Sequence, residues 1–526
     1  MKKKITLITP LENKYPMEIT SGKVFMPRYG PLALAGVLQK GGYDVVLFDE
    51  NAGSGIDWNR VRDSDAVCFS LMSFCAKKGY SYIQKARSLS DAAIIIGGLH
   101  ASMMPEECLD HCDWLIRREG DETLPLLLAS IFGGGDTKNI AGISYKKPDG
   151  TVTHNPDRPP VADIRHSADP RVVAGYRPLT FRKVMSDIIS NHVPRFNVLP
   201  VQATRGCPYG CSFCFVKHEL GTEYRKRDPD EVVRDIEIGM ERLKTNYIFF
   251  VDNDLTIDRE YTKSLFEKLI GRFPGGLNIY FFARVSLGHD SELLELARGT
   301  GKVCVAVGVE SINDMTLKQL NKGQTREEIV ESLAAFRRHK IDIQALTIFG
   351  GENDTVETIR DTVRFYLENR VYNIGICCLY DFPFKKRHFG YEQMWPDHRF
   401  IHHDWRFYNG NFVVFYPRLM KPGALQKEIL LSFRRFYMKQ KKTVFQFHPS
   451  LATVKHYIPY LESAEKGLYA PDETLIEDRL HGLQRPDHIP LRVSKTSILN
   501  EALLFYMHNF YRPISWNFLR SIAGSV

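Results

Sequence analysis

The chain has 526 residues, of which 44% are hydrophobic and 12% aromatic. This composition supports several buried cores and excludes a disordered or collagen-like chain, and the length predicts about three domains. The formal net charge of +8 is compatible with an anionic substrate but too small to indicate a nucleic acid partner. No apolar run reaches about 18 residues, so we expect no transmembrane helix.

The cysteines and the first residues indicate a reducing compartment. The start, MKKKITLITP, lacks the apolar core and the cleavage site of a signal peptide. Ten cysteines in a chain without secretory features favour a cytoplasmic location, where clustered cysteines bind metal more often than they form disulfides. Seven are scattered, and three lie close together at Cys207, Cys211 and Cys214.

The first 154 residues alternate short apolar runs with helical patterns. Strands are expected at Ile5–Ile8, Val45–Phe48, Ala66–Ser70 and Ile94–Gly98, with helices at Pro31–Gln39 and Tyr80–Leu89. A hairpin over Ile140–His154 closes the series. This order predicts a doubly wound, Rossmann-like parallel α/β domain over residues 1–154. Ligands of such sheets bind beyond the carboxyl ends of the strands, which here are followed by Ser70–Cys75 and Gly97–Ser102.

A proline-rich linker over residues 155–196 precedes a second alternating series. Its expected strands are Val201–Thr204, Tyr247–Val251, Ile279–Ala283, Val303–Val309, Gln344–Phe349 and Ile374–Leu379. Capping boxes are expected at Asp228/Glu231, Thr325/Glu328 and Asp354/Glu357. Six βα units predict a partial (β/α)6 barrel, similar to a TIM barrel, over residues 197–380.

Residues 381–526 form the least regular region, which we expect to be mostly α-helical. Its segments Lys385–His388 and Arg399–Tyr408 combine cations, histidines and aromatic rings. These groups suit a lid that closes a substrate cavity, with a solvated basic surface as the alternative.

The three clustered cysteines form a C-x3-C-x2-C motif just after the first expected barrel strand. Three thiolates in one short loop can hold three irons of a cubane cluster and leave the fourth iron open. A zinc site would need a fourth ligand, and His218 is the only local candidate, so zinc remains an alternative at this point.

This loop, with Phe213 before the last cysteine, resembles that of the radical S-adenosylmethionine (SAM) superfamily. The resemblance implies a [4Fe–4S] cluster on Cys207, Cys211 and Cys214, with SAM bound to the fourth iron. The reduced cluster then cleaves SAM to methionine and a 5′-deoxyadenosyl radical that abstracts hydrogen from the substrate. The implied SAM contacts are Phe213, Asp252, Arg284, Ser286, Glu310 and Gly350. Gly351 replaces the proline expected there, and salt bridges are the alternative roles of Glu310 and Arg284.

The amino-terminal half resembles the cobalamin-binding domain of class B radical SAM enzymes. The matching segments are Phe25–Ala35, Ile96-Gly97-Gly98-Leu99-His100 and Arg118-Glu119-Gly120-Asp121-Glu122. The resemblance implies that Ser70, Gly97, Gly98, His100 and Glu119 contact cobalamin.

The Asp-x-His-x-x-Gly loop of other corrinoid proteins is absent, because residues 9–13 read Thr-Pro-Leu-Glu-Asn. No protein histidine is therefore expected on cobalt, and His100 is expected near the nucleotide tail. A degenerate domain that binds no corrinoid remains an alternative.

The resemblance as a whole implies a cobalamin-dependent C-methyltransferase acting on an unactivated carbon. An oxidative cyclase or a rearrangement enzyme on the same scaffold is the first alternative. A tRNA methylthiotransferase is disfavoured because residues 1–150 lack a second cysteine triad, and a corrinoid sensor would leave the cysteine loop unexplained. The expected partners are a small-molecule or lipid-like substrate and an electron donor such as a reductase, flavodoxin or ferredoxin. Peripheral membrane contact through Leu499–Phe510 stays open, with core packing favoured.

Overall fold

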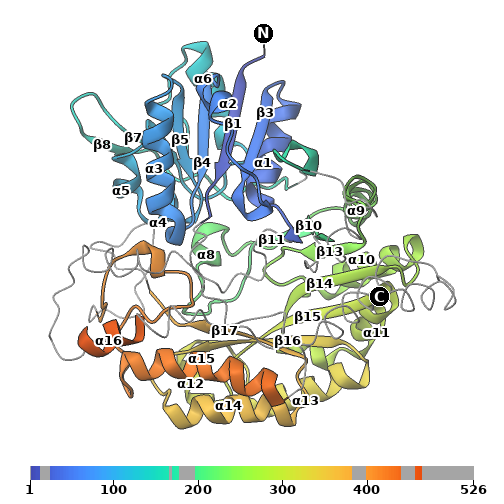
Figure 1. Ribbon diagram of the computed structural model, residues 1–526. Helices are drawn as coiled ribbons and strands as arrows, with labels where there is room; N and C mark the ends of the chain where they lie inside the picture. Colours follow the sequence, from blue (N-terminus) through green and yellow to red (C-terminus); the bar gives the residue numbers. More distant parts are fainter. Residues whose placement is uncertain are drawn as a thin grey trace, which may run out of the picture.

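The computed structural model describes residues 2–11, 24–164, 169–176, 196–381, 399–439 and 457–464. Two sheets with their helices lie one above the other, and the chain segment around α8 (Val216–Glu219) lies between them (Figure 1). The segments Lys385–His388 and Leu499–Phe510 lie outside the described residues. Within the described part, no helix is long and apolar enough to cross a bilayer.

The amino-terminal sheet has the strand order β3-β1-β4-β5-β6-β7-β8. Its strands are β1 (Lys4–Thr9), β3 (Asp44–Asp49), β4 (Ala66–Ser70), β5 (Ala93–Gly97), β6 (Trp114–Ile116), β7 (Ile143–Lys146) and β8 (Val152–His154). The strands from β3 to β6 pair in parallel, and β7 and β8 form the expected antiparallel hairpin at one edge. The doubly wound fold is therefore confirmed.

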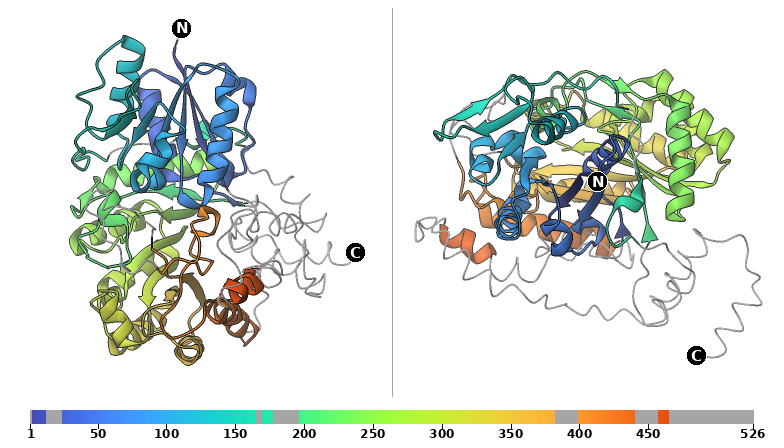
Figure 2. Two further views of the ribbon diagram at one scale, coloured as in Figure 1. Left: turned by 90° about the vertical axis from the view of Figure 1, so that its left-hand side faces the viewer. Right: turned by 90° about the horizontal axis from the view of Figure 1, so that it is seen from above.

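Helices cover both faces of this sheet (Figure 2). Side chains such as Leu7 and Leu47 pack on one face with residues of α1 (Tyr29–Lys40) and α6 (Thr123–Gly133). Ile8 and Phe48, one position further along each strand, pack on the other face with α2 (Trp58–Arg62), α3 (Ala76–Arg87) and α5 (Pro105–Leu109). The alternation follows from the two-residue period of a strand.

The second sheet has six parallel strands in the order β10-β13-β14-β15-β16-β17. They are β10 (Leu199–Val201), β13 (Tyr247–Phe250), β14 (Leu277–Arg284), β15 (Gly301–Glu310), β16 (Asp342–Phe349) and β17 (Asn373–Cys378). Its helices are α9 (Pro229–Leu243), α10 (Arg259–Arg272), α11 (Ser291–Thr300), α12 (Asp314–Gln319), α13 (Arg326–Arg338) and α14 (Val356–Glu368). The end strands β10 and β17 do not pair with each other, so the partial barrel is confirmed.

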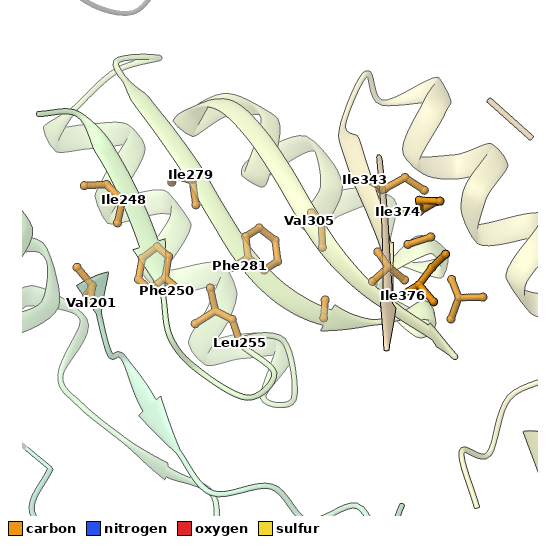
Figure 3. Close-up of a cluster of buried hydrophobic side chains, with 14 of the residues drawn as sticks. Val201, Ile248, Phe250, Leu255, Ile279, Phe281, Val305, Ile343, Ile374 and Ile376 are labelled. Carbon is orange, nitrogen blue, oxygen red and sulfur yellow. The ribbon is translucent and has the colours of Figure 1, made fainter. Parts of the chain in front are cut away.

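One face of the barrel sheet packs on its helices. Alternate side chains of successive strands, among them Ile279 and Phe281, join a single buried cluster (Figure 3). The ring of Phe281 lies 5.8 Å from that of Phe266 on α10. The intervening residues, such as Tyr280 and Phe282, face the other, concave side and are only half buried.

Two expectations about local structure are wrong in detail. The expected strand Val201–Thr204 is interrupted, because β10 ends at Val201 and Thr204–Arg205 form β11, which pairs antiparallel with β12 (Arg225–Lys226). The capping box at Thr325/Glu328 is present, but those at Asp228/Glu231 and Asp354/Glu357 are not. Asp228 caps α9 by accepting from the backbone N–H of Asp230, without the reciprocal bond of Glu231. Helix α14 begins instead with a box made by Thr355 and Thr358, because Asp354 accepts hydrogen bonds from the backbone of Gly350 and Gly351.

The described carboxyl-terminal region is mainly helical. Helix α15 (Pro422–Lys439) packs on α14, and α16 (Ile458–Ala464) packs on α15. Before them, a short 3-10 helix, η5 (Trp405–Phe407), reaches up to the amino-terminal domain and contacts η2 (Ser73–Cys75) and α3. This segment, which follows the last barrel strand in the chain, therefore contacts the first domain.

Candidate functional site

The three cysteines lie in one loop between β11 and β12, below the carboxyl ends of the amino-terminal strands (Figure 1). Gly206 opens the loop with a φ of +92°, and a Cβ there would collide with the carbonyl oxygen of Glu223. Cys211 is buried, Cys207 and Cys214 are half buried, and none forms a disulfide. The loop therefore keeps three free thiols close together.

The donor set fits an iron–sulfur cluster better than a single ion. Among the described residues, no three His, Cys, Asp or Glu side chains are arranged to hold one metal ion. Three thiolates of a cubane cluster bind three different irons, so their sulfurs need not converge on one point. His218, the candidate zinc ligand, is half buried on α8 and belongs to no such group.

Arg284, at the end of β14, lies against the cysteine loop. Its Nη1 is 3.7 Å from the Sγ of Cys211, and its guanidinium carbon lies 4.0 Å from the ring centroid of Tyr209. Its Nη2 donates to the carbonyl oxygen of Lys322. Ser286, in the 3-10 helix η4 (Val285–His289), is exposed. The structure thus brings Arg284 to the loop and leaves the Ser286 side chain at the surface.

Glu310 forms a buried ion pair at the end of β15. Its Oε1 lies 2.7 Å from the Nζ of Lys322, which is also 5.9 Å from the ring centroid of Phe213. Glu310 has a φ of +63°, and a Cβ on Gly308 would lie 2.6 Å from that Nζ. Sequence reasoning named Glu310 and Phe213 but missed Lys322, which has no motif around it.

Asp252 is fully buried at the end of β13. Its carboxylate accepts a 2.6 Å hydrogen bond from the hydroxyl of Thr204 and others from the backbone N–H groups of Ala203 and Thr204. Burial raises the pKa of Asp252 to about 6. The carboxylate therefore holds the chain where it leaves β10 for the cysteine loop.

The turn Gly350–Gly351 ends β16 on the same side of the barrel. Gly350 has a φ of +103°, and a Cβ there would lie 2.8 Å from the ring of Phe415. Both backbone N–H groups donate to Asp354, and burial raises the pKa of this carboxyl to about 6. Only glycine fits position 350.

A cavity of about 60 Å³ lies at the carboxyl ends of β1, β4 and β5. Ser70, Gly97 and Gly98 line it, together with mainly apolar residues of the strands and of α1 and α6. Gly98 has a φ of +94°, and a Cβ there would lie 2.8 Å from the carbonyl oxygen of Leu71. The lining suits an apolar group, but this volume holds only about two water molecules, so a whole ring requires the lining to open further.

His100 and Glu119 do not line this cavity. His100 is fully buried, with its Nε2 2.9 Å from the hydroxyl of Tyr80 and its Nδ1 3.1 Å from that of Ser73. Its ring meets that of Trp405, whose Nε1 donates to Glu107 at 3.0 Å. Trp405 is thus buried against the first domain rather than on the surface of a lid.

Glu119 lies in a buried cluster of four charges with Asp121, Arg205 and Arg225. The two carboxylates come from the loop after β6, and the two arginines come from β11 and β12. Sequence reasoning missed both arginines, although Arg205 stands two residues before the first cysteine of the motif.

A doubly wound domain lies beside a partial barrel, and the first barrel loop carries three thiols that could ligate a [4Fe–4S] cluster. The comparisons agree. Residues 19–128 match the B12 binding domain, and residues 201–366 match the radical SAM superfamily. The chain belongs to the cobalamin-binding radical SAM enzymes.

Curated relatives match over most of their length. The chain is 27% identical to a bacteriochlorophyllide d C-12(1)-methyltransferase of Chlorobaculum tepidum, over 83% of this chain and 88% of that protein. It is 26% identical to an anaerobic magnesium-protoporphyrin IX monomethyl ester cyclase of Rubrivivax gelatinosus, over 79% of this chain and 74% of that protein.

Solved structures show the same fold. The radical SAM methyltransferase TsrM from Kitasatospora setae, with cobalamin and a [4Fe–4S] cluster bound, superposes with a TM-score of 0.58 at 20% identity over 72% of each chain. The cobalamin-dependent S-adenosylmethionine radical enzyme OxsB superposes with a TM-score of 0.53 at 16% identity. The match covers all of this chain and 81% of that one.

Proposed function

We propose that this chain is a cobalamin-dependent radical SAM C-methyltransferase. The observation that carries the proposal is the loop of three free thiols, which lies between the barrel strands and the B12-binding domain. The cluster, when bound, supplies the electron that cleaves SAM, and cobalamin supplies the methyl group. A reductase, flavodoxin or ferredoxin would reduce both.

In this proposal Cys207, Cys211 and Cys214 ligate the cluster. Arg284 lies beside Cys211 and supplies positive charge where the SAM carboxylate would lie. The SAM site would also include Phe213, Glu310 and Gly350, which lie at or near the loop and at the strand ends. Asp252 would act indirectly, through the backbone of Ala203 and Thr204 that it binds. Ser286 is exposed, and its surroundings do not favour a direct contact with SAM.

For cobalamin, the cavity at Ser70, Gly97 and Gly98 would receive part of the nucleotide tail, because its lining is mainly apolar. The contacts of His100 and Glu119 favour positioning roles over direct ones. We further propose domain bounds of 1–154 and 197–380, with residues 381–526 as a region that completes the substrate cavity.

The concave face of the barrel sheet favours a largely apolar small molecule as substrate. Phe249, Tyr280 and Phe282 form an aromatic group there, with ring centroids 5.2 to 5.8 Å apart. Leu346 and Ile348 of β16 face the same side. The names of the relatives, a bacteriochlorophyllide methyltransferase and a hopanoid C-3 methylase, agree with this chemistry.

Replacing Cys207, Cys211 and Cys214 together by Ala tests the cluster. The variant should lose the brown [4Fe–4S] absorbance and form no 5′-deoxyadenosine from SAM with dithionite, because its three thiolate ligands are gone. A control with Ala at Cys304 and Cys377, outside the loop, should keep both properties. Formation of 5′-deoxyadenosine by the triple variant would refute the radical SAM assignment.

Methyl transfer has one specific competitor, since a relative named as a cyclase aligns with 79% of the chain. Mass spectrometry of products from SAM labelled at the methyl group separates the two. A labelled product heavier by one methyl-derived carbon supports the methyltransferase, whereas an unlabelled, oxidised or ring-closed product supports the cyclase.

A further inference from the structure

A buried cluster of four charges joins the amino-terminal domain to the barrel. Glu119 and Asp121 follow β6, whereas Arg205 ends β11 and Arg225 begins β12. The Nη1 of Arg205 lies 2.9 Å from the Oε1 of Glu119 and 3.0 Å from the Oδ2 of Asp121. The Nη1 of Arg225 lies 2.8 Å from the Oε2 of Glu119. Each of the four side chains is at most 8% exposed.

The two arginines stand at the base of the cysteine loop. Arg205 and Arg225 are directly paired in the short antiparallel ladder of β11 and β12, and residues 206–224 form the loop between them. Because Glu119 binds both arginines, a single carboxylate of the first domain holds both ends of the loop that carries Cys207, Cys211 and Cys214.

The other hydrogen bonds of the cluster fix its geometry. The backbone N–H of Val161 donates to Glu119 at 2.7 Å, and Arg205 donates twice to Gln202. Arg225 donates to the carbonyl oxygen of Leu220, inside the loop, at 2.6 Å. Removing one partner of such a buried set leaves a charge without compensation, which costs far more than an exposed pair contributes.

We infer that Glu119 is a positioning residue that holds the cysteine loop in place relative to the B12-binding domain. The inference rests on the proposed function for its consequence, which is a fixed separation between the cluster and cobalamin. In this assignment Glu119 acts through Arg205 and Arg225 and touches neither cofactor.

Glu119→Gln tests the inference, because glutamine keeps the size of the side chain and removes its charge. In the protein without cofactors, amide hydrogen exchange of peptides within residues 206–224 should quicken about tenfold. In the reconstituted holoenzyme, pulsed electron paramagnetic resonance should show a broadened distribution of distances between the reduced cluster and cob(II)alamin. Iron and corrinoid contents should stay near those of the wild type.

Glu428→Gln is the matched control. Glu428, on α15, is also a buried carboxylate bound by two arginines, Arg360 and Arg435, but it lies away from the cysteine loop. This variant should leave both the exchange of the loop and the distance distribution unchanged. Unchanged exchange and distances in Glu119→Gln would overturn the inference, as would equal effects of the two variants.

If Glu119→Gln does not fold, Arg225→Lys is measured in its place. Lysine retains the charge but loses the second donor to Leu220, so the exchange of the loop should still quicken, and exchange at the wild-type rate would overturn the inference. A wild-type protein that bound no cluster or no corrinoid would contradict the proposed function. The exchange experiment without cofactors would still decide whether Glu119 holds the loop.

Discussion

The buried ion pair of Glu310 and Lys322 fills the space beside Gly308. A Cβ at this position would lie 2.6 Å from the Nζ of Lys322 and 2.7 Å from the Oε1 of Glu310. Both side chains are buried, so neither charge can exchange its partner for water. A side chain at position 308 would therefore have to displace the charged ends of this pair.

The variant Gly308→Ala should force Lys322 and Glu310 apart and weaken SAM binding about tenfold, the loss expected for one hydrogen bond between charged groups. Equilibrium dialysis with cluster-loaded protein measures this affinity, and iron content should not change. Gly271→Ala is the control, since a Cβ at this position of α10 meets nothing within 4 Å. Equal SAM affinities of the wild type and Gly308→Ala would remove Glu310 from the proposed SAM site.

His402 is a second buried group whose partners fix its charge. Its Nε2 lies 3.1 Å from the hydroxyl of Tyr457, which itself donates to the carbonyl oxygen of Val413. Its Nδ1 accepts from the backbone N–H of Asp404, so this nitrogen carries no proton. Burial lowers the pKa of His402 to about 4.

Stability should therefore fall as the pH drops from about 6.5 to about 4, because the unfolded chain binds a proton there that the folded chain does not. At pH 5 the loss in unfolding free energy should be about 2 kcal/mol. His402→Gln, which cannot titrate, should lower the thermal midpoint at pH 7 but reduce its change between pH 7 and pH 5. Parallel profiles of the two proteins would show that His402 does not cause the pH dependence.

At the scale of elements, the sequence was sufficient where one local pattern determines the structure. The buried strands are continuous apolar runs, and the capping box of α13 is complete within Thr325–Glu328, so both could be predicted. The interruption after Val201 could not, because it depends on hydrogen bonds from Ala203 and Thr204 to Asp252, about 50 residues away.

In the candidate site, too, local motifs could be predicted from the sequence and contacts between distant residues could not. The cysteines form a local motif, whereas the ion pair of Glu310 with Lys322 and the bonds of Glu119 to Arg205 and Arg225 exist only in the folded chain. The resemblance placed His100 and Glu119 near cobalamin because they belong to the segments that match the cobalamin-binding domain, but it carried no information about the direction of their side chains. Their assigned contacts with the cofactor stay predictions.

The segment η5 illustrates how an aromatic residue can appear as part of a lid in the sequence and pack in the interior of the structure. Trp405 is 6% exposed, contacts the ring of His100 and donates to Glu107 of α5. The Oδ1 of the neighbouring residue Asp404 lies 3.6 Å from the Nζ of Lys77 on α3. These contacts attach the carboxyl-terminal region to the first domain.

Trp405→Phe should keep most of the ring packing but remove the hydrogen bond to Glu107, at a cost of about 1.5 to 3 kcal/mol. Trp405→Ala should cost about 3 to 5 kcal/mol, because it also leaves a cavity. Thermal unfolding and the rate of limited proteolysis within residues 399–415 measure both effects. Trp58→Phe, at a half-buried tryptophan within the first domain, should leave proteolysis of this segment unchanged, and an equal effect of both Phe variants would contradict the role of the contact.

At the scale of the molecule, the two domains are joined by segments from three regions of the chain. Strand β2 (Val24–Phe25) of the first half pairs with β9 (Phe196–Asn197), which immediately precedes the barrel. The cluster around Glu119 forms the second connection, and η5 forms the third. These three sets of contacts together hold the first domain against the barrel.

The contact between Glu107 and Trp405 spans 298 residues of sequence, which has a consequence for biosynthesis. At 5 to 20 residues per second, a ribosome completes Trp405 about 15 to 60 s after Glu107. During that interval the first domain can fold while the face formed by α3 and α5 has no covering segment. The face of α3 and α5 is therefore covered only after the segment around Trp405 has been made, well after the helices that form the face.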